Sequence, residues 1–383
     1  MPSFTSNSDI HLTRRAVPGG RWFAPLCVAA LLGAVAIGGQ EAWLAARGFV
    51  PTVVDSASTW AHQRARASEL GHDALILVGS SRMQLDVDLD ELQHLTGRPA
   101  VQLAIDGSSF VPILADLAAD ERVTGTVIVD YQDHVVGDLH LQDGSAAYLS
   151  EWHRMESRGS VLNFTTAEKW LDGRMHDHMR SFADGASPFD SLTLRLLDRQ
   201  ATPQYLVTLP DRERRADYSR VAMPQFYYSR AMRNAGINKI PPVTSWQALN
   251  EAISAHIAAM PVSDMPAFDG NAGIVSGYVR QIERRGGQVI FVMFPRSGLV
   301  RAADEKMFPK ERYWSRFLGV VRAPALDYRD VPEMVALICP DGSHLDARDQ
   351  QTFTKALVTA VPALRDGKMG VANPVAAQDP SEE

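Results

Sequence analysis

The sequence predicts an α/β protein, a three-layer α/β/α domain with a short parallel sheet, preceded by one transmembrane helix. Short runs of consecutive apolar residues recur along the chain, each followed by glycine, aspartate or proline, and helical stretches separate them. Unbroken apolar runs are typical of parallel strands that are buried on both faces. A longer uncharged run stands near the N-terminus. With 383 residues, 45% of them hydrophobic and 22% charged, the chain can bury a large core, which excludes a wholly disordered protein.

The uncharged run, WFAPLCVAALLGAVAIGG, begins at Trp22, and a helix over residues 22–46 is long enough to cross a hydrocarbon core of about 30 Å. Three arginines precede it, Arg14, Arg15 and Arg21. By the positive-inside rule we expect residues 1–21 in the cytoplasm, one span in the cytoplasmic (inner) membrane, and a periplasmic or extracellular domain. A cleaved signal peptide ending near Ala34-Val35-Ala36 is the alternative, and it also exports the domain.

The charge balance narrows the class of partner. The chain has 45 acidic and 38 basic residues, a formal net charge of -7. Because there is no basic excess, nucleic-acid binding is excluded as the main activity, and we expect small, neutral or membrane-borne partners.

Beyond the membrane segment, the order of elements predicts parallel crossovers. Residues 47–72 read as a membrane-proximal linker with a helix from Thr59 to Leu70. Four strands and two helices are predicted: strands over Ala74–Val78, Val101–Ile105, Thr126–Val129 and Gln288–Phe294, and helices over Phe110–Ala119 and Val275–Arg285. A strand, helix and parallel strand in succession form a right-handed crossover in almost all proteins.

The predicted domain spans residues 73–365, and an insertion at about 138–270 interrupts it. The insertion is rich in aromatic residues, namely Trp152, Trp170, Tyr205, Tyr218, Phe226, Tyr227, Tyr228 and Trp246. A lid or a glycan-binding surface is one interpretation, but aromatic residues at this density more often fill a local core, which we favour. Residues 366–383 have the composition of a disordered tail.

Side chains suited to nucleophilic catalysis occur near both ends of the domain. Ser80 and Ser81 follow the first strand, at the carboxyl edge of the sheet where such folds bind ligands, so one of them is a candidate nucleophile. Asp341 precedes His344 by a spacing that puts both side chains on one face of a turn. Asp341 can then accept from the Nδ1–H of His344 and leave Nε2 to take the serine proton. Backbone N–H groups of Ser81 and Gly107 are the candidate oxyanion donors.

Four segments together resemble the SGNH (GDSL-like) hydrolase superfamily: Gly79 to Arg82, Ala104 to Ser109, Phe294-Pro295, and CPDGSHLD from Cys339 to Asp346. The resemblance covers about 72–135 and 275–362 and implies the flavodoxin-like SGNH fold. It makes Ser81 the nucleophile and Ser80 the replacement of the family's aspartate. It also places Gly107 on the family's oxyanion glycine and aligns Asp341 and His344 with its Asp-x-x-His pair.

One block departs from the family pattern. Where the family has an asparagine that donates to the oxyanion, this chain reads VDYQDH over 129–134. Gln132 is the expected substitute, because its amide can donate in the same way. Arg82 is a candidate for binding a substrate anion or the glycan, with a buried ion pair as the alternative.

A membrane anchor followed by Gly-Ser-Ser-Arg is similar to membrane-anchored acyl-transfer proteins of envelope polymers, such as the teichoic acid D-alanine transfer protein and periplasmic alginate-type O-acetyltransferases. The resemblance implies transfer or removal of acyl groups, in particular O-acetyl groups, on an exported polysaccharide through an acyl-serine. It further implies a multi-pass membrane acyltransferase as donor, and no cofactor. A catalytically silent glycan-binding or assembly factor and a simple esterase of small esters are the alternatives.

Two clusters of titratable residues lack metal-ligand spacing: Asp86, Asp88 and Asp90, and His153, His176 and His178. We therefore predict no metal site, and we expect Asp90 to cap the following helix. Cys339 is interpreted as a small core residue rather than a nucleophile. No disulfide is predicted, because the other cysteine, Cys27, lies in the apolar run.

Overall fold

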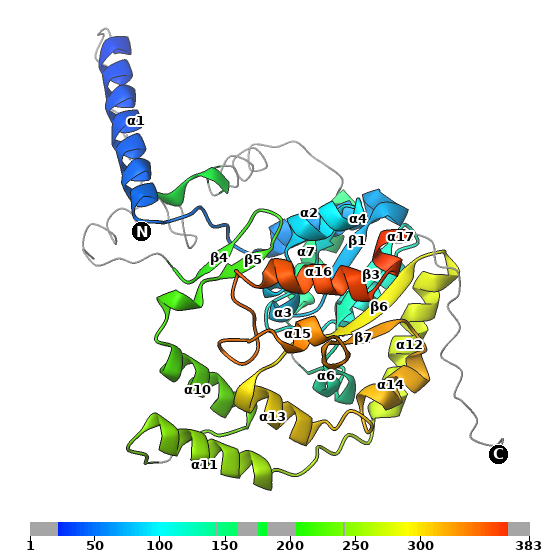
Figure 1. The fold of residues 1–383 in the computed structure, drawn as a ribbon. Coiled ribbons are helices and arrows are strands. Elements are labelled where there is room, and N and C mark those ends of the chain that lie inside the picture. The colour runs from blue at the N-terminus through cyan, green and yellow to red at the C-terminus, as the bar shows by residue number, and fades with distance from the viewer. Residues whose placement is uncertain are drawn as a thin grey trace, which may run out of the picture.

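The structure is a computed structural model that describes residues 22–141, 144–158, 175, 177–181, 204–239 and 242–366. Its centre is a five-stranded parallel sheet in the order β2-β1-β3-β6-β7 (Figure 1). The strands are β1 (Leu75–Val78), β2 (Ala100–Gln102), β3 (Thr126–Asp130), β6 (Gln288–Met293) and β7 (Ala325–Asp327). The mixed α/β class with a parallel sheet is therefore confirmed.

Each predicted strand is present, with small changes at the ends. β2 ends at Gln102 instead of Ile105, although the N–H of Ile105 still donates to the carbonyl of Gly79 at 3.0 Å. The edge strand β7 was missed because its three residues, Ala-Leu-Asp, form no apolar run.

Helices account for most of the remaining described chain. They are α1 (Phe23–Ala46), α2 (Ala57–Leu70), α3 (Ser81–Leu85), α4 (Leu89–Thr96), α5 (Val111–Ala119), α6 (Asp133–Gly137), α7 (Ala146–Arg158), α10 (Met223–Asn234), α11 (Trp246–Ala259), α12 (Phe268–Arg284), α13 (Gly298–Met307), α14 (Trp314–Val321), α15 (Pro332–Val335), α16 (Gln350–Ala360) and α17 (Ala363–Asp366). Single 3-10 turns are η1 (Gly71–Asp73), η3 (Tyr218–Arg220) and η4 (Tyr328–Asp330). α12 packs against α5 and α14, whereas α2 packs against α7 and α16 against α4.

Helix α12 begins at Phe268 instead of the predicted Val275. Glycine and asparagine in this first part are poor helix formers and hid it in the sequence. Phe268, Ala272 and Val275 are nevertheless all buried, on one helical stripe, so tertiary packing extends the helix.

The core follows the apolar runs that predict the strands. All four residues of β1 are fully buried, and Ile76 faces Val101 on one side and Val127 on the other. Phe110 and Phe291 meet edge to face with ring centroids 6.2 Å apart, so aromatic packing joins the start of α5 to β6.

Helix α1 projects from the α/β body in Figure 1, and most of its large apolar side chains are exposed, whereas Leu44 is buried. By length and composition it can cross a membrane, with a mean hydropathy of 1.8. A signal sequence near the N-terminus meets the same criterion. The three arginines on which the orientation depends, and the predicted tail from residue 367 onward, lie outside the described residues.

The insertion adds an antiparallel hairpin, β4 (Leu206–Thr208) with β5 (Arg214–Ala216), and the helices α10 and α11, which pack on α13. The rings of Tyr205, Tyr218 and Phe226 contact one another beside Leu85 of α3. Local core filling is thus confirmed for these three, while Trp246 is half exposed and Trp170 lies outside the described residues.

Candidate active site

The order of the strands indicates where a parallel sheet of this kind binds ligands. The chain passes from β1 to β2 on one side, and β3 lies on the other, so the strand order reverses at β1. Parallel sheets bind ligands at such a switch point, outside the carboxyl ends of the strands. The turns after β1, β2 and β3 therefore lie where such a sheet is expected to bind its ligand.

A glycine lets the chain turn sharply after β1. Gly79 has φ +154, and a Cβ at this position would lie 2.5 Å from the Cβ of Asp130 at the end of β3. Only glycine fits this conformation and this close approach. Ser80 then precedes α3 as its N-cap, and Ser81 is the first helical residue, partly exposed at the edge of the sheet.

The loop after Cys339 holds the acid and the base together. Asp341 Oδ1 accepts the backbone N–H groups of Ser343 and His344, each at 2.8 Å, and Oδ2 lies 2.8 Å from His344 Nδ1. An ionised carboxylate can only accept, so Nδ1 carries the imidazole proton and Nε2 is left as an acceptor. His344 Nε2 lies 2.8 Å from Ser81 Oγ. The structure thus brings Ser81, His344 and Asp341 into one hydrogen-bonded chain.

The ionisation of the pair suits proton transfer. Burial lowers the pKa of His344, and the positive charges of Arg230 and Arg82 lower it further. The hydrogen bond and charge of Asp341 raise it, but the pKa remains below its usual value. Burial raises the pKa of Asp341, but the hydrogen bond and charge of His344 and the charge of Arg230 outweigh burial and hold it well below the usual range. At neutral pH, His344 is therefore a neutral acceptor beside a carboxylate.

Two backbone donors face the same edge. The N–H of Ser81 lies in the first turn of α3, where helical N–H groups have no intrahelical acceptor. The hydrogen bond from the N–H of Ile105 to the carbonyl of Gly79 holds the ends of β1 and β2 side by side. Ser81 comes two residues after Gly79, and Gly107 comes two residues after Ile105. No hydrogen bond within the described chain takes up either N–H group.

Gln132 does not turn its amide toward Ser81. Its side chain is buried, and Nε2 donates to Ser80 Oγ at 2.8 Å and to Asp130 Oδ2 at 3.1 Å, which uses both amide hydrogens. Ser80 Oγ in turn donates to Asp130 Oδ2 at 2.9 Å. The expected donation from Gln132 to an oxyanion therefore has no support in its placement, and the candidate donors are Ser81 and Gly107 alone.

Arg82 belongs to the same buried network. Its side chain is 10% exposed, Nε lies 3.4 Å from Asp130 Oδ1, and Nη1 lies 3.5 Å from Ser343 Oγ. The ion-pair alternative thus describes its position, and Arg82 connects the end of β3 to the loop that carries His344.

The insertion supplies two residues that sequence reasoning missed. Arg230 of α10 is one-third exposed, with Nε 3.1 Å from Asp341 Oδ2. Tyr218 also lies near Asp341, and burial followed by the Asp341 charge raises the pKa of Tyr218. No spacing signal links these residues to Asp341, because the contact is purely tertiary.

The other candidates do not join the hydrogen-bonded chain of Ser81, His344 and Asp341, although Asp86 Oδ1 accepts the N–H of Leu345, next to His344, at 2.9 Å. No group of histidine, cysteine or acidic side chains in the described ranges could hold a metal ion, and His176 lies outside them. The cap of α4 is Asp88 and not Asp90, since Asp88 accepts the N–H of Glu91 at 2.9 Å. Cys339 is buried, and burial raises the pKa of its thiol well above the usual value.

Comparison with models of known protein families and with curated proteins finds no match to this chain.

Proposed function

We propose that this chain is a membrane-anchored, exported SGNH-type serine enzyme that transfers or removes acyl groups, in particular O-acetyl groups, on a cell-envelope or exported polysaccharide. One observation carries the proposal: the chain from Ser81 Oγ to His344 Nε2 and from His344 Nδ1 to Asp341 Oδ2, with 2.8 Å at each step. We further infer a three-layer α/β/α arrangement and an N-terminus on the cytoplasmic side of the membrane.

The proposed reaction has two halves. Ser81 Oγ attacks the acyl carbonyl carbon as its proton passes to His344 Nε2, and the N–H groups of Ser81 and Gly107 donate to the oxyanion. His344 returns the proton to the leaving oxygen as the C–O bond breaks, which leaves an acyl-serine. A sugar hydroxyl or water then loses its proton to His344 and attacks the ester, and the proton returns to Ser81 Oγ.

The test uses the full chain in detergent micelles with a fluorophosphonate probe that labels activated serines. We expect wild type to be labelled and Ser81→Ala and His344→Ala to lose labelling. Ser80→Ala is the matched control, because Ser80 Oγ faces Asp130 and Gln132 and not the histidine, so this variant should keep labelling. A folded wild type that is not labelled, or labelling lost equally in Ser80→Ala and Ser81→Ala, would overturn the assignment.

A second experiment separates transfer from hydrolysis. With p-nitrophenyl acetate as donor, acetylated oligosaccharide in the products indicates a transferase, and free acetate alone indicates an esterase. The silent glycan-binding alternative is favoured by the placement of Gln132, which leaves two candidate oxyanion donors. Glycan binding that is unchanged in Ser81→Ala, without labelling or turnover in wild type, would support that alternative.

A further inference from the structure

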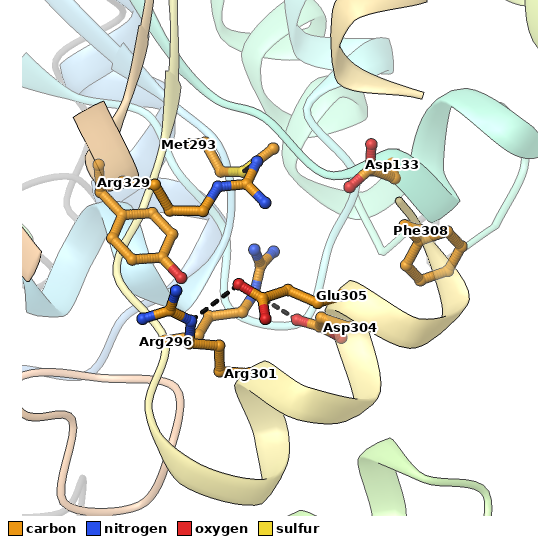
Figure 2. A pocket seen from close by; sticks show the side chains of 9 residues that line it. Asp133, Met293, Arg296, Arg301, Asp304, Glu305, Phe308 and Arg329 are labelled. Atoms are coloured by element: carbon orange, nitrogen blue, oxygen red, sulfur yellow. Dashed lines mark hydrogen bonds and ion pairs between the residues drawn. The ribbon is translucent and has the colours of Figure 1, made fainter. Parts of the chain in front are cut away.

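A hollow lies at the carboxyl ends of β3, β6 and β7. It is lined by residues that follow these strands, among them Asp133, Arg296 and Arg329, and by α13 (Figure 2). The hollow is shallow and open to solvent, so it suits one small group at its mouth rather than a large enclosed ligand. The neighbouring Ser297 donates its N–H to the carbonyl of Gly342 at 3.0 Å, so the hollow adjoins the loop that carries His344.

Three guanidinium groups border this hollow, those of Arg296, Arg301 and Arg329 (Figure 2). Each Nε atom lies beside a carboxylate. Arg301 Nε donates to Glu305 at 2.8 Å and Arg329 Nε donates to Asp327 at 2.9 Å, while Arg296 Nε forms an ion pair with Asp304 at 2.5 Å. The guanidinium planes are thereby oriented before any ligand arrives. Preorganised donors lower the entropy cost of binding.

The terminal nitrogens of these arginines have few partners in the described chain. Arg296 is 8% exposed, and among the described residues its guanidinium has no hydrogen-bond acceptor, with Nε buried. The Nη atoms of Arg301 likewise have no hydrogen-bond acceptor among the described residues, since its one hydrogen bond uses Nε. The guanidinium of Arg301 lies 5.8 Å from the ring centre of Tyr328. In Arg329, Nη2 bonds Asp327, and no bond uses Nη1. Guanidinium N–H groups that have no acceptor in the described chain are available to a ligand with several oxygen acceptors.

We propose that this arginine pocket binds a single oxyanion group, the carboxylate or phosphate of a small ligand or of a charged sugar. The planar fork of an arginine side chain matches both groups through paired N–H donors. Asp304 and Glu305 are occupied by the arginines that they orient, and Asp133 accepts the Tyr131 hydroxyl at 3.0 Å. The proposal does not depend on a catalytic role for Ser81.

Isothermal titration of the full chain in detergent micelles, with inorganic phosphate, glucuronate and chloride at equal ionic strength, tests the proposal. We expect saturable binding of phosphate or of glucuronate, but not of chloride, and the two arms identify which group the pocket accepts. Arg301→Gln should weaken binding about tenfold, as loss of a charge-assisted contact.

Arg316→Gln is the matched control, because Arg316 is about as exposed as Arg301, is also paired with a carboxylate, and lies outside the pocket. It should leave binding unchanged. Arg296→Lys keeps the charge and removes the fork, and should weaken binding in a protein that is still folded by circular dichroism. Absence of saturable binding by wild type, or equal binding by Arg301→Gln and Arg316→Gln, would refute the proposal.

Discussion

Replacing Gly342 by alanine should destabilise the loop between the acid and the base. Gly342 has φ +87, where an L-residue is strained by roughly 1–2 kcal/mol. The added Cβ would also overlap Val300 Cγ2 and lie 2.9 Å from Val300 Cβ, and overpacking of this kind costs about 1–3 kcal/mol. The two costs together lower the free energy of unfolding by roughly 2–5 kcal/mol.

The same change should reduce the reactivity of Ser81. Asp341 and His344 flank the glycine, and their hydrogen bonds depend on the position of the loop. A displacement of about 1 Å in a reacting group can lower the rate by about a hundredfold, so fluorophosphonate labelling of Gly342→Ala should slow by up to that factor.

Urea unfolding followed by tryptophan fluorescence separates strain from overlap. Gly286 is the matched control: its φ is +91, and a Cβ there would meet nothing within 4 Å, so Gly286→Ala should cost only the strain. Val300→Ala should recover part of the loss when combined with Gly342→Ala, as a coupling energy in a double-mutant cycle. Equal costs for the two glycine variants, or zero coupling to Val300, would refute the reasoning.

Three further changes test the surroundings of the site. Arg230→Gln removes a positive charge that lowers the pKa of His344, so the acid limb of the pH profile of fluorophosphonate labelling should move to higher pH. Arg233→Gln on the same helix is the control and should leave that limb in place. Arg212→Met should cost about 3–5 kcal/mol in urea unfolding, because Arg212 is fully buried and bonds one carboxylate and two carbonyls; a cost below 1 kcal/mol would contradict this. Burial raises the pKa of Glu213 from 4.5 to about 7, so between these pH values the folded state binds more protons than the unfolded state. The free energy of unfolding of wild type relative to Glu213→Gln should therefore fall as the pH rises from 4.5 to about 7. A difference that does not change with pH would contradict this.

Local patterns explain which parts of the fold and site could be predicted. β1, β3 and β6 are continuous apolar runs because both faces of the sheet are covered, and such runs are visible without tertiary information. Ser81 follows a strand directly, and Asp341 and His344 share one turn, so short spacing was sufficient to select all three.

The rest depends on contacts between distant segments. Gln132 has the right chemistry for an oxyanion donor, but Ser80 and Asp130 take up its amide, and that competition is set by packing. Arg230 reaches Asp341 from an insertion helix whose position depends on α11 and α13. Neither contact has a periodic or spaced signature in the sequence.

Ser81 and His344 are 263 positions apart along the chain, so the hydrogen bond between them forms only after the last part of the domain has been synthesised. Until the last part of the domain has been synthesised and has docked, the Ser81 hydroxyl has no base beside it and is as inert as any other alcohol. Under the proposed function, a newly made chain would not react with acyl donors before its last segment has docked. The same geometry makes inactivation abrupt, because a proteolytic cut that releases either segment silences the hydroxyl completely.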